Sequence, residues 1–179
     1  MQKLRFAAIG CGRMGQRRIR GILDHPQAEL VCVSDEDAAL ARRIAQQSKC
    51  EVARDYREVA NSPGVDCIAI SVPNYMHKAI AVTGLEAKKH VFCEKPLAAN
   101  PEEAAEMVQV AAKNGVFLTT GTNFRHFPSL GKAKELLDQH AIGELMFLRG
   151  WIGVELVGGR PASFWGFRPE MSGGGATLD

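Results

Sequence analysis

A glycine-rich turn between an apolar run and a helical segment constrains the fold of this chain most strongly. The run Leu4–Ile9 leads directly into Gly10-Cys11-Gly12-Arg13-Met14-Gly15, and a helix is expected from about Met14 to Leu23. In G-x-G-x-x-G, the glycines permit a tight turn, close approach of a ligand to the backbone, and close packing of helix on sheet. The pattern predicts a strand–turn–helix unit that holds a dinucleotide pyrophosphate at the helix N terminus.

Short apolar runs alternate with segments of helical period as far as Thr120. This alternation predicts a parallel sheet with right-handed crossovers and helices on both faces, so residues 1–120 are expected to form an α/β, doubly wound, dinucleotide-binding domain. The expected strands are Leu4–Ile9, Glu29–Ser34, Val52–Ala53, Cys67–Val72, His90–Cys93 and Phe117–Thr120. The expected helices are Met14–Leu23, Asp37–Gln47, Tyr56–Ala60, Tyr75–Leu85 and Pro101–Lys113 with Asn100 as N-cap.

The pattern changes after Gly121, which suggests that a second domain begins near this residue and that residues 121–179 are its first part. We expect a helix over 130–139, an apolar strand over 145–151 and a loop over 157–169. The strand would present Phe147, Leu148 and Trp151 on an unpaired edge that is liable to associate. The closing run of glycines, 173–175, suggests a chain that is cut within a motif.

Composition excludes several function classes. The net charge of +2 gives no strong field for nucleic acid or an anionic membrane. Five cysteines without a C-x-x-C pair indicate buried thiols in a reducing compartment, and no metal-ligand spacing is present. Without a signal peptide or a run of about 18 apolar residues, the chain is expected to be cytoplasmic.

The first helix carries a cluster of arginines. The cluster favours a solvated helix face, and a phosphate contact by Arg13 is the main alternative. The arginines are Arg13, Arg17, Arg18 and Arg20.

Asp35 follows the second expected strand, 20 residues after Gly15. A carboxylate at this position accepts hydrogen bonds from a ribose 2′-hydroxyl and repels a 2′-phosphate, so NAD is favoured over NADP. Asp37 is better explained as an acid at the N terminus of the next helix.

The segment Ser71-Val72-Pro73-Asn74-Tyr75-Met76-His77 follows the fourth expected strand, where the strand order of such a sheet reverses and ligands bind. Ser71, Pro73 and Asn74 are therefore expected to line the cofactor. His77 lies in the first turn of the following helix, either beside the cofactor or as a packed histidine with a satisfied hydrogen bond.

Glu94-Lys95-Pro96 follows the fifth expected strand. A lysine at this sheet edge could take a hydroxyl proton while hydride leaves the substrate carbon for a nicotinamide. Taken alone, Lys95 could equally be a solvated lysine at the end of a strand.

Together these motifs resemble the Gfo/Idh/MocA family of glucose–fructose oxidoreductases and inositol dehydrogenases. The resemblance covers the whole chain through the glycine turn, Pro73-Asn74 with His77, Glu94-Lys95-Pro96, Asn123 with Arg125, and the closing glycines. It implies an NAD(P)-binding domain followed by a domain with an open, mostly antiparallel sheet that forms homo-oligomers. It also implies oxidation and reduction of sugars, sugar nucleotides, inositols or related polyols.

The resemblance assigns roles to individual residues. Lys95 matches the catalytic lysine, and Asp179 matches an aspartate that acts with a histidine beyond the last residue of this chain. Glu94 and Asn123 would contribute to the cofactor site, while substrate would meet Lys95, Asn123, Arg125 and Trp165. His126 is expected near the domain junction. Trp165 precedes Gly166 here instead of the arginine that many relatives carry. A dinucleotide-binding module without dehydrogenase activity is the alternative for this chain.

Overall fold

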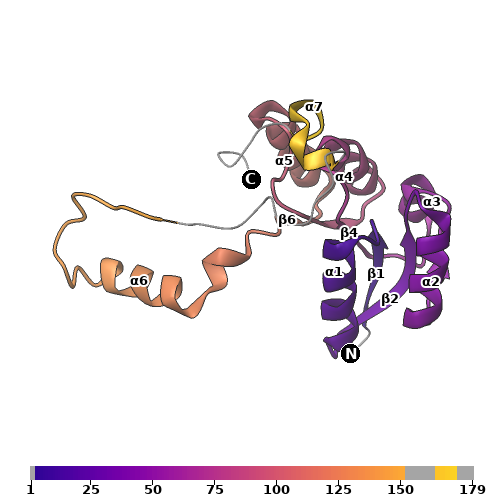
Figure 1. Ribbon diagram of the computed structural model, residues 1–179, viewed down its shortest axis with the longest axis horizontal. Helices are drawn as coiled ribbons and strands as arrows, with labels where there is room; N and C mark the ends of the chain where they lie inside the picture. Colours follow the sequence, from indigo (N-terminus) through magenta and orange to yellow (C-terminus); the bar gives the residue numbers. More distant parts are fainter. Residues whose placement is uncertain (1–2, 152–163, 173–179) are drawn as a thin grey trace. The chain divides into compact units, whose positions relative to one another are not determined.

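The first part of the chain folds around one parallel sheet. The computed structural model describes residues 3–151 and 164–172, and its sheet has the strand order β3-β2-β1-β4-β5-β6 (Figure 1). The order reverses between β1 and β4, and every pair of neighbours is parallel. This arrangement confirms the predicted α/β doubly wound fold. The strands are β1 (Leu4–Ile9), β2 (Ala28–Ser34), β3 (Glu51–Val52), β4 (Cys67–Ile70), β5 (His90–Cys93) and β6 (Leu118–Thr120).

The helices begin and end at local signals in the sequence. Side-chain oxygens of Asp37, Asp55 and Asn100 accept backbone N–H groups at the start of α2, α3 and α5. Gly115, in the left-handed conformation, ends α5. The helices are α1 (Arg13–Asp24), α2 (Ala38–Ser48), α3 (Tyr56–Asn61), α4 (His77–Glu86), α5 (Pro101–Asn114), α6 (Pro128–Asp138) and α7 (Pro169–Ser172). Three 3₁₀ turns are η1 (Asn74–Met76), η2 (Asn123–His126) and η3 (Trp165–Phe167).

Both faces of the sheet are buried, because successive strand residues point to opposite sides. Ile68 and Ile70 of β4 join a core cluster with α4 and α5, whereas Ala69 joins a second cluster with α1 and α2. The first cluster includes Ile80, Leu85, Val91 and Met107. The second includes Ile19, Ile22, Leu30, Val33 and Ile44.

The chain separates into two compact units. The first comprises residues 1–121 together with 165–179, and the second comprises 122–164. The described part of the C-terminal segment, η3 and α7, therefore belongs with the sheet, and Ser172 accepts a hydrogen bond from Asn74. The predicted division of the whole protein into domains at residue 121 stays a prediction.

The described part of the second unit contains η2 and α6 but no strand. The prediction of a strand over 145–151 is wrong for this structure, in which these residues carry no regular secondary structure. No neighbouring strand pairs with them in the described part of the chain, so their backbone gains no ladder hydrogen bonds. Met146 and Phe147 are 89% and 80% exposed. The predicted loop over 157–169 lies mostly outside the described residues, and its described end contains the turn η3.

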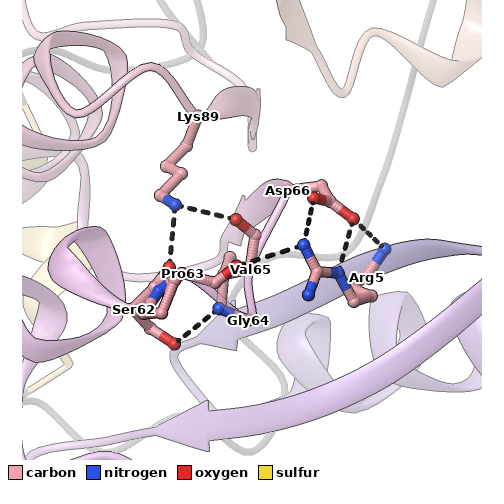
Figure 2. A network of polar contacts seen from close by, with 7 residues as sticks. All are labelled: Arg5, Ser62, Pro63, Gly64, Val65, Asp66 and Lys89. Carbon is pink, nitrogen blue, oxygen red and sulfur yellow. Dashed lines mark hydrogen bonds and ion pairs between the residues drawn. The ribbon is translucent and has the colours of Figure 1, made fainter.

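A network of hydrogen bonds and ion pairs at the amino-terminal edge of the sheet connects Arg5 and Lys89 to the turn before β4 (Figure 2). Arg5 on β1 binds the Asp66 carboxylate through its backbone N–H, Nε and Nη2, at 2.9, 3.0 and 2.8 Å. Lys89 donates to the carbonyl oxygens of Ser62 and Val65, both at 2.8 Å. The Arg5 guanidinium lowers the pKa of Asp66 to about 2, mainly through the side-chain hydrogen bond. These contacts hold the turn between α3 and β4.

No helix in the described ranges is long and apolar enough to cross a membrane.

Candidate active site

The glycine turn joins β1 to α1 at the carboxyl edge of the sheet, and two of its glycines are required by the protein itself. Gly10 has φ +91°, and a Cβ there would lie 2.3 Å from the carbonyl oxygen of Ser71. A Cβ on Gly15 would lie 1.8 Å from the carbonyl oxygen of Gly10. Gly12 differs, because a Cβ at that position would meet no atom of the described chain within 4 Å. The open space beside Gly12 suits a ligand that approaches the backbone.

The N terminus of α1 carries no side-chain cap. Its N-cap residue, Gly12, makes no capping hydrogen bond, whereas α2, α3 and α5 are all capped by side chains. The first turn of α1 therefore presents N–H groups and the positive end of the helix dipole to an anion. Arg13 is exposed at this end and Met14 is half-buried. Gln16 holds the turn by donating to the carbonyl oxygen of Cys11 at 3.0 Å.

Asp35 lies beside this turn, as the motif spacing predicted. One carboxylate oxygen accepts the backbone N–H of Cys11 at 2.6 Å, and the other accepts that of Asp37 at 2.9 Å. Each carboxylate oxygen can accept more than one hydrogen bond, so Asp35 can also receive a ribose hydroxyl. Asp37 caps α2 through the N–H groups of Ala39 and Leu40, which confirms its helix-terminal role.

The segment after β4 borders the same turn. The Ser71 hydroxyl is buried, with no hydrogen-bond partner in the described structure. An orphaned hydroxyl beside an uncapped helix N terminus fits a bound polar group such as a phosphate. Pro73 is half-buried, and the buried Asn74 donates to the carbonyl oxygen of Ser172 at 2.8 Å. The site therefore suits a dinucleotide, because it combines open space at Gly12, an unpaired hydroxyl on Ser71 and the carboxylate of Asp35.

His77 is a fully buried residue that links two loops. Its Nδ1 lies 2.8 Å from the carbonyl oxygen of Pro96, and its Nε2 lies 3.0 Å from that of Val72. This position matches the second of the two interpretations of His77, that of a packed histidine with a satisfied hydrogen bond. Both ring nitrogens face carbonyl oxygens of the protein, so His77 packs between the Val72 and Pro96 backbones.

Glu94 lies directly after β5, where it is 6% exposed. Its Oε1 pairs with Nε and Nη2 of Arg18 on α1, and its Oε2 accepts the backbone N–H of Lys95 at 3.3 Å. The Arg18 guanidinium also lies over the Phe92 ring, 5.0 Å from its centroid. A solvated role for Arg18 is therefore wrong, since this arginine packs between α1 and β5.

Arg18 could have been identified from the helical period. It lies on the same side of α1 as the buried residues Gly15 and Ile22, three residues after one and four before the other. Phe92 on β5 and Glu94 directly after the strand are two residues apart, so an extended backbone turns both side chains to the same side. The sequence therefore contained a signal for this contact.

Lys95 is half-buried at the end of β5 and precedes Pro96 through a cis peptide bond. Since Glu94 N–H donates to the carbonyl oxygen of Ile70 at 3.0 Å, the backbone of the lysine loop adjoins the end of β4. The carboxyl edge of the sheet therefore holds both the glycine turn, after β1, and Lys95, after β5, and these two strands flank β4.

Other predicted site residues lie elsewhere in the chain. Asn123, Arg125 and His126 are exposed in η2, which belongs to the second unit. Trp165 is half-buried in η3 of the first unit. Asp179 lies outside the described residues. The roles of Asn123, Arg125, Trp165 and Asp179 thus stay predictions.

The cysteines near the site are unreactive thiols. Burial raises the pKa of Cys11 and of Cys93 to about 12, and the nearby Asp35 carboxylate raises that of Cys11 further. A thiol with such a pKa is a poor nucleophile at neutral pH. Four of the five cysteines are buried as predicted, and Cys50 is half-buried.

Comparison with known proteins agrees with this geometry. Residues 4–122 match the family model GFO_IDH_MocA, described as an oxidoreductase family with an NAD-binding Rossmann fold. The chain is 30% identical over 98% of its length to dTDP-3,4-didehydro-2,6-dideoxy-alpha-D-glucose 3-reductase of Saccharopolyspora spinosa and covers 52% of that protein.

Two solved structures are also similar. Myo-inositol 2-dehydrogenase from Lactobacillus plantarum aligns with a TM-score of 0.74 and 27% identity, over 80% of this chain and 43% of that one. KijD10, a 3-ketoreductase from Actinomadura kijaniata solved with NADP and TDP-benzene, aligns with a TM-score of 0.74 and 26% identity, over 80% and 44%. The chain spans about half the length of the curated relatives that it matches.

Proposed function

Because the chain belongs to the Gfo/Idh/MocA family of oxidoreductases, we propose that it supplies the cofactor domain and catalytic lysine of an NAD-dependent dehydrogenase. The proposed reaction interconverts a secondary hydroxyl and a ketone on a sugar, inositol or related polyol. The proposal rests on one observation: Lys95 and the uncapped glycine turn both lie at the carboxyl edge of the sheet. Two relatives, named as a sugar 3-reductase and an inositol dehydrogenase, support this substrate class.

The residues that would hold the cofactor lie at the ends of β1, β2 and β4. The N–H groups at the start of α1 would bind the pyrophosphate, and the open space at Gly12 would admit it. The Ser71 hydroxyl would gain its missing partner there. Asp35 would accept a ribose hydroxyl and disfavour a 2′-phosphate, so we propose NAD as the preferred cofactor over NADP. When bound, the nicotinamide supplies the hydride chemistry.

Lys95 is proposed as the acid–base group. During oxidation its amine would take the proton of the reacting hydroxyl, and during reduction it would return that proton to the carbonyl oxygen. Asp179 is proposed to act beside it. Asn123, Arg125 and Trp165 are proposed to contact substrate, with Asn123 also near the cofactor, within a second domain that begins near residue 121. The complete protein is proposed to form a homo-oligomer.

A Lys95→Met variant of the complete protein tests the reaction. We expect kcat for NAD reduction by a panel of inositols and sugars to fall by about 10²-fold or more, because general acid–base groups contribute that much. The Kd for NAD should change little. Arg20→Met, an exposed change on α1, is the control. Turnover that survives Lys95→Met within a few-fold would rule out this assignment, and NAD binding without turnover in the parent protein would favour a non-catalytic binding module.

A further inference from the structure

The contact between Arg18 and Glu94 joins the helix at the glycine turn to the loop that carries Lys95. Arg18 lies on α1, and the N terminus of this helix, at the glycine turn, has no side-chain cap. Glu94 immediately precedes Lys95, and its side chain is 7% exposed. A carboxylate this deeply buried requires a partner charge, and Arg18 supplies it.

The two oxygens of Glu94 face different elements. Oε1 receives the Arg18 guanidinium from α1, and Oε2 receives the Lys95 N–H from its own loop. The guanidinium also packs on the face of the Phe92 ring. The orientation of the carboxylate is therefore fixed by α1, and the carboxylate in turn holds the first peptide of the lysine loop.

Gly121 closes this junction from the end of β6. A Cβ on Gly121 would lie 3.0 Å from Glu94 Oε2 and 3.3 Å from Arg18 Nη2. Its backbone N–H donates to the carbonyl oxygen of Cys93 at 2.9 Å. A side chain at this position would therefore press on both partners of the ion pair.

We propose that Arg18 and Glu94 are positioning residues that set the geometry of Lys95 relative to the dinucleotide turn. The proposal rests on the proposed function, since it assigns the pair to the same reaction. In this role the effect of Glu94 on the reaction passes through Arg18 and the Lys95 backbone, which its two carboxylate oxygens contact. A displacement of the lysine amine by about 1 Å would be enough to lower the rate strongly.

The experiment compares Arg18→Met, Arg18→Lys and the control Arg20→Met in the 179-residue chain. Three quantities are measured: the Kd for NADH by fluorescence, the exchange rate of the Lys95 backbone amide by NMR, and the rate at which trace acetic anhydride labels the Lys95 amine relative to that of the exposed Lys113. In Arg18→Met we expect the Lys95 amide to exchange about tenfold faster, because a charge-assisted hydrogen bond is lost. The relative labelling rate of Lys95 should change by at least about threefold, while the Kd for NADH changes by less than that.

The variants separate positioning from simple stability. Arg18→Lys keeps a cation opposite Glu94 and should restore much of the Lys95 protection, whereas Arg20→Met should match the parent chain. If Arg18→Met alone does not fold, the double variant Arg18→Met/Glu94→Gln removes the unpaired buried charge and should still show altered Lys95 labelling. A folded Arg18→Met or double variant with unchanged Lys95 exchange and labelling would overturn the proposal. Failure of the parent chain to bind NADH would instead count against the proposed function, and the two Lys95 measurements would still decide the positioning role.

Discussion

At the scale of single residues, the three glycines of the turn have different physical roles. Gly10 and Gly15 are required because a Cβ would overlap a carbonyl oxygen of the protein, whereas Gly12 faces open space. The backbone of Gly12, with φ −66° and ψ −168°, is one that alanine adopts without strain. Its substitution should therefore affect the ligand and leave the fold intact.

Gly12→Ala and Gly15→Ala test this difference. We expect Gly12→Ala to change the free energy of unfolding by less than about 1 kcal/mol and to weaken NAD binding by at least about tenfold, because the methyl group occupies the pyrophosphate space. Gly15→Ala should destabilise the chain by about 2 kcal/mol through overpacking. Urea unfolding and calorimetric titration measure the two effects. Equal NAD affinity in Gly12→Ala and the parent chain would contradict the placement of the pyrophosphate.

Asp35 is the residue that decides between the two nicotinamide cofactors. Asp35→Ala should weaken NAD binding by about tenfold, because a ribose hydroxyl loses a charged acceptor. Asp35→Asn keeps an oxygen for the Cys11 N–H and removes the repulsion of a 2′-phosphate, so the affinity ratio of NADP to NAD should rise. Glu36→Ala, at the exposed neighbour, is the control. Tighter binding of NADP than of NAD by the parent chain would refute the preference.

The positions of residues that belong to a motif could be predicted from the sequence, whereas positions that depend on packing between elements were harder to predict. The contact of Asp35 with the glycine turn follows from the spacing of the motif. The contact of Arg18 with Phe92 could be predicted only by combining the helical period of α1 with the alternation of side chains along β5. His77 had two interpretations, and only the carbonyl oxygens on both sides of the ring distinguish them.

At the scale of elements, the turn between α3 and β4 depends on Arg5, Asp66 and Lys89. The pKa of Asp66 is about 2 in the folded chain, below its ordinary value of 3.8, because of the hydrogen bonds from Arg5. A lowered carboxyl pKa means that the stabilisation is fully present above pH 3.8 and is lost as the pH falls through 2. Because both side chains are about one-third exposed, solvent screening reduces the contribution to roughly 1 kcal/mol.

Asp66→Asn should lower the free energy of unfolding by about 1 kcal/mol at pH 7. The difference from the parent chain should shrink between pH 4 and pH 2, because the parent carboxyl is then protonated as well. Asp24→Asn, at an exposed position of α1, serves as the control. Urea unfolding followed by circular dichroism across this pH range measures the effect, and a difference that is independent of pH would exclude the ion pair as its source.

The elements of the sheet were predictable because each strand and helix has its own local signal and its own buried face. Expected boundaries differ from the observed ones by one or two residues in β2, β3, β4 and β6. The segment 145–151 shows why the rest was not predictable. Its apolar residues have the composition of a strand, but strand formation needs a neighbour, and none is present in the described part of the chain.

At the scale of the whole molecule, the segment 145–151 exposes a cluster of large apolar side chains. Leu145, Met146, Phe147, Leu148 and Trp151 are all more than half exposed. A cluster of this size favours association, because contact with another apolar surface removes it from water. The 179-residue chain is therefore expected to self-associate through this segment, while NAD is expected to bind to its first unit.

Phe147→Glu tests this expectation. We expect the parent chain to form dimers or larger species at about 100 µM and Phe147→Glu to shift them toward monomer, measured by size-exclusion chromatography with light scattering. The Kd for NAD should not change, because Phe147 lies in the other compact unit from the glycine turn, Asp35 and Ser71. Phe117→Glu, at an apolar residue of the first unit that is 78% exposed, controls for the general effect of replacing a surface phenylalanine by a charge. A parent chain that stays monomeric at this concentration would show that the segment is not an association site.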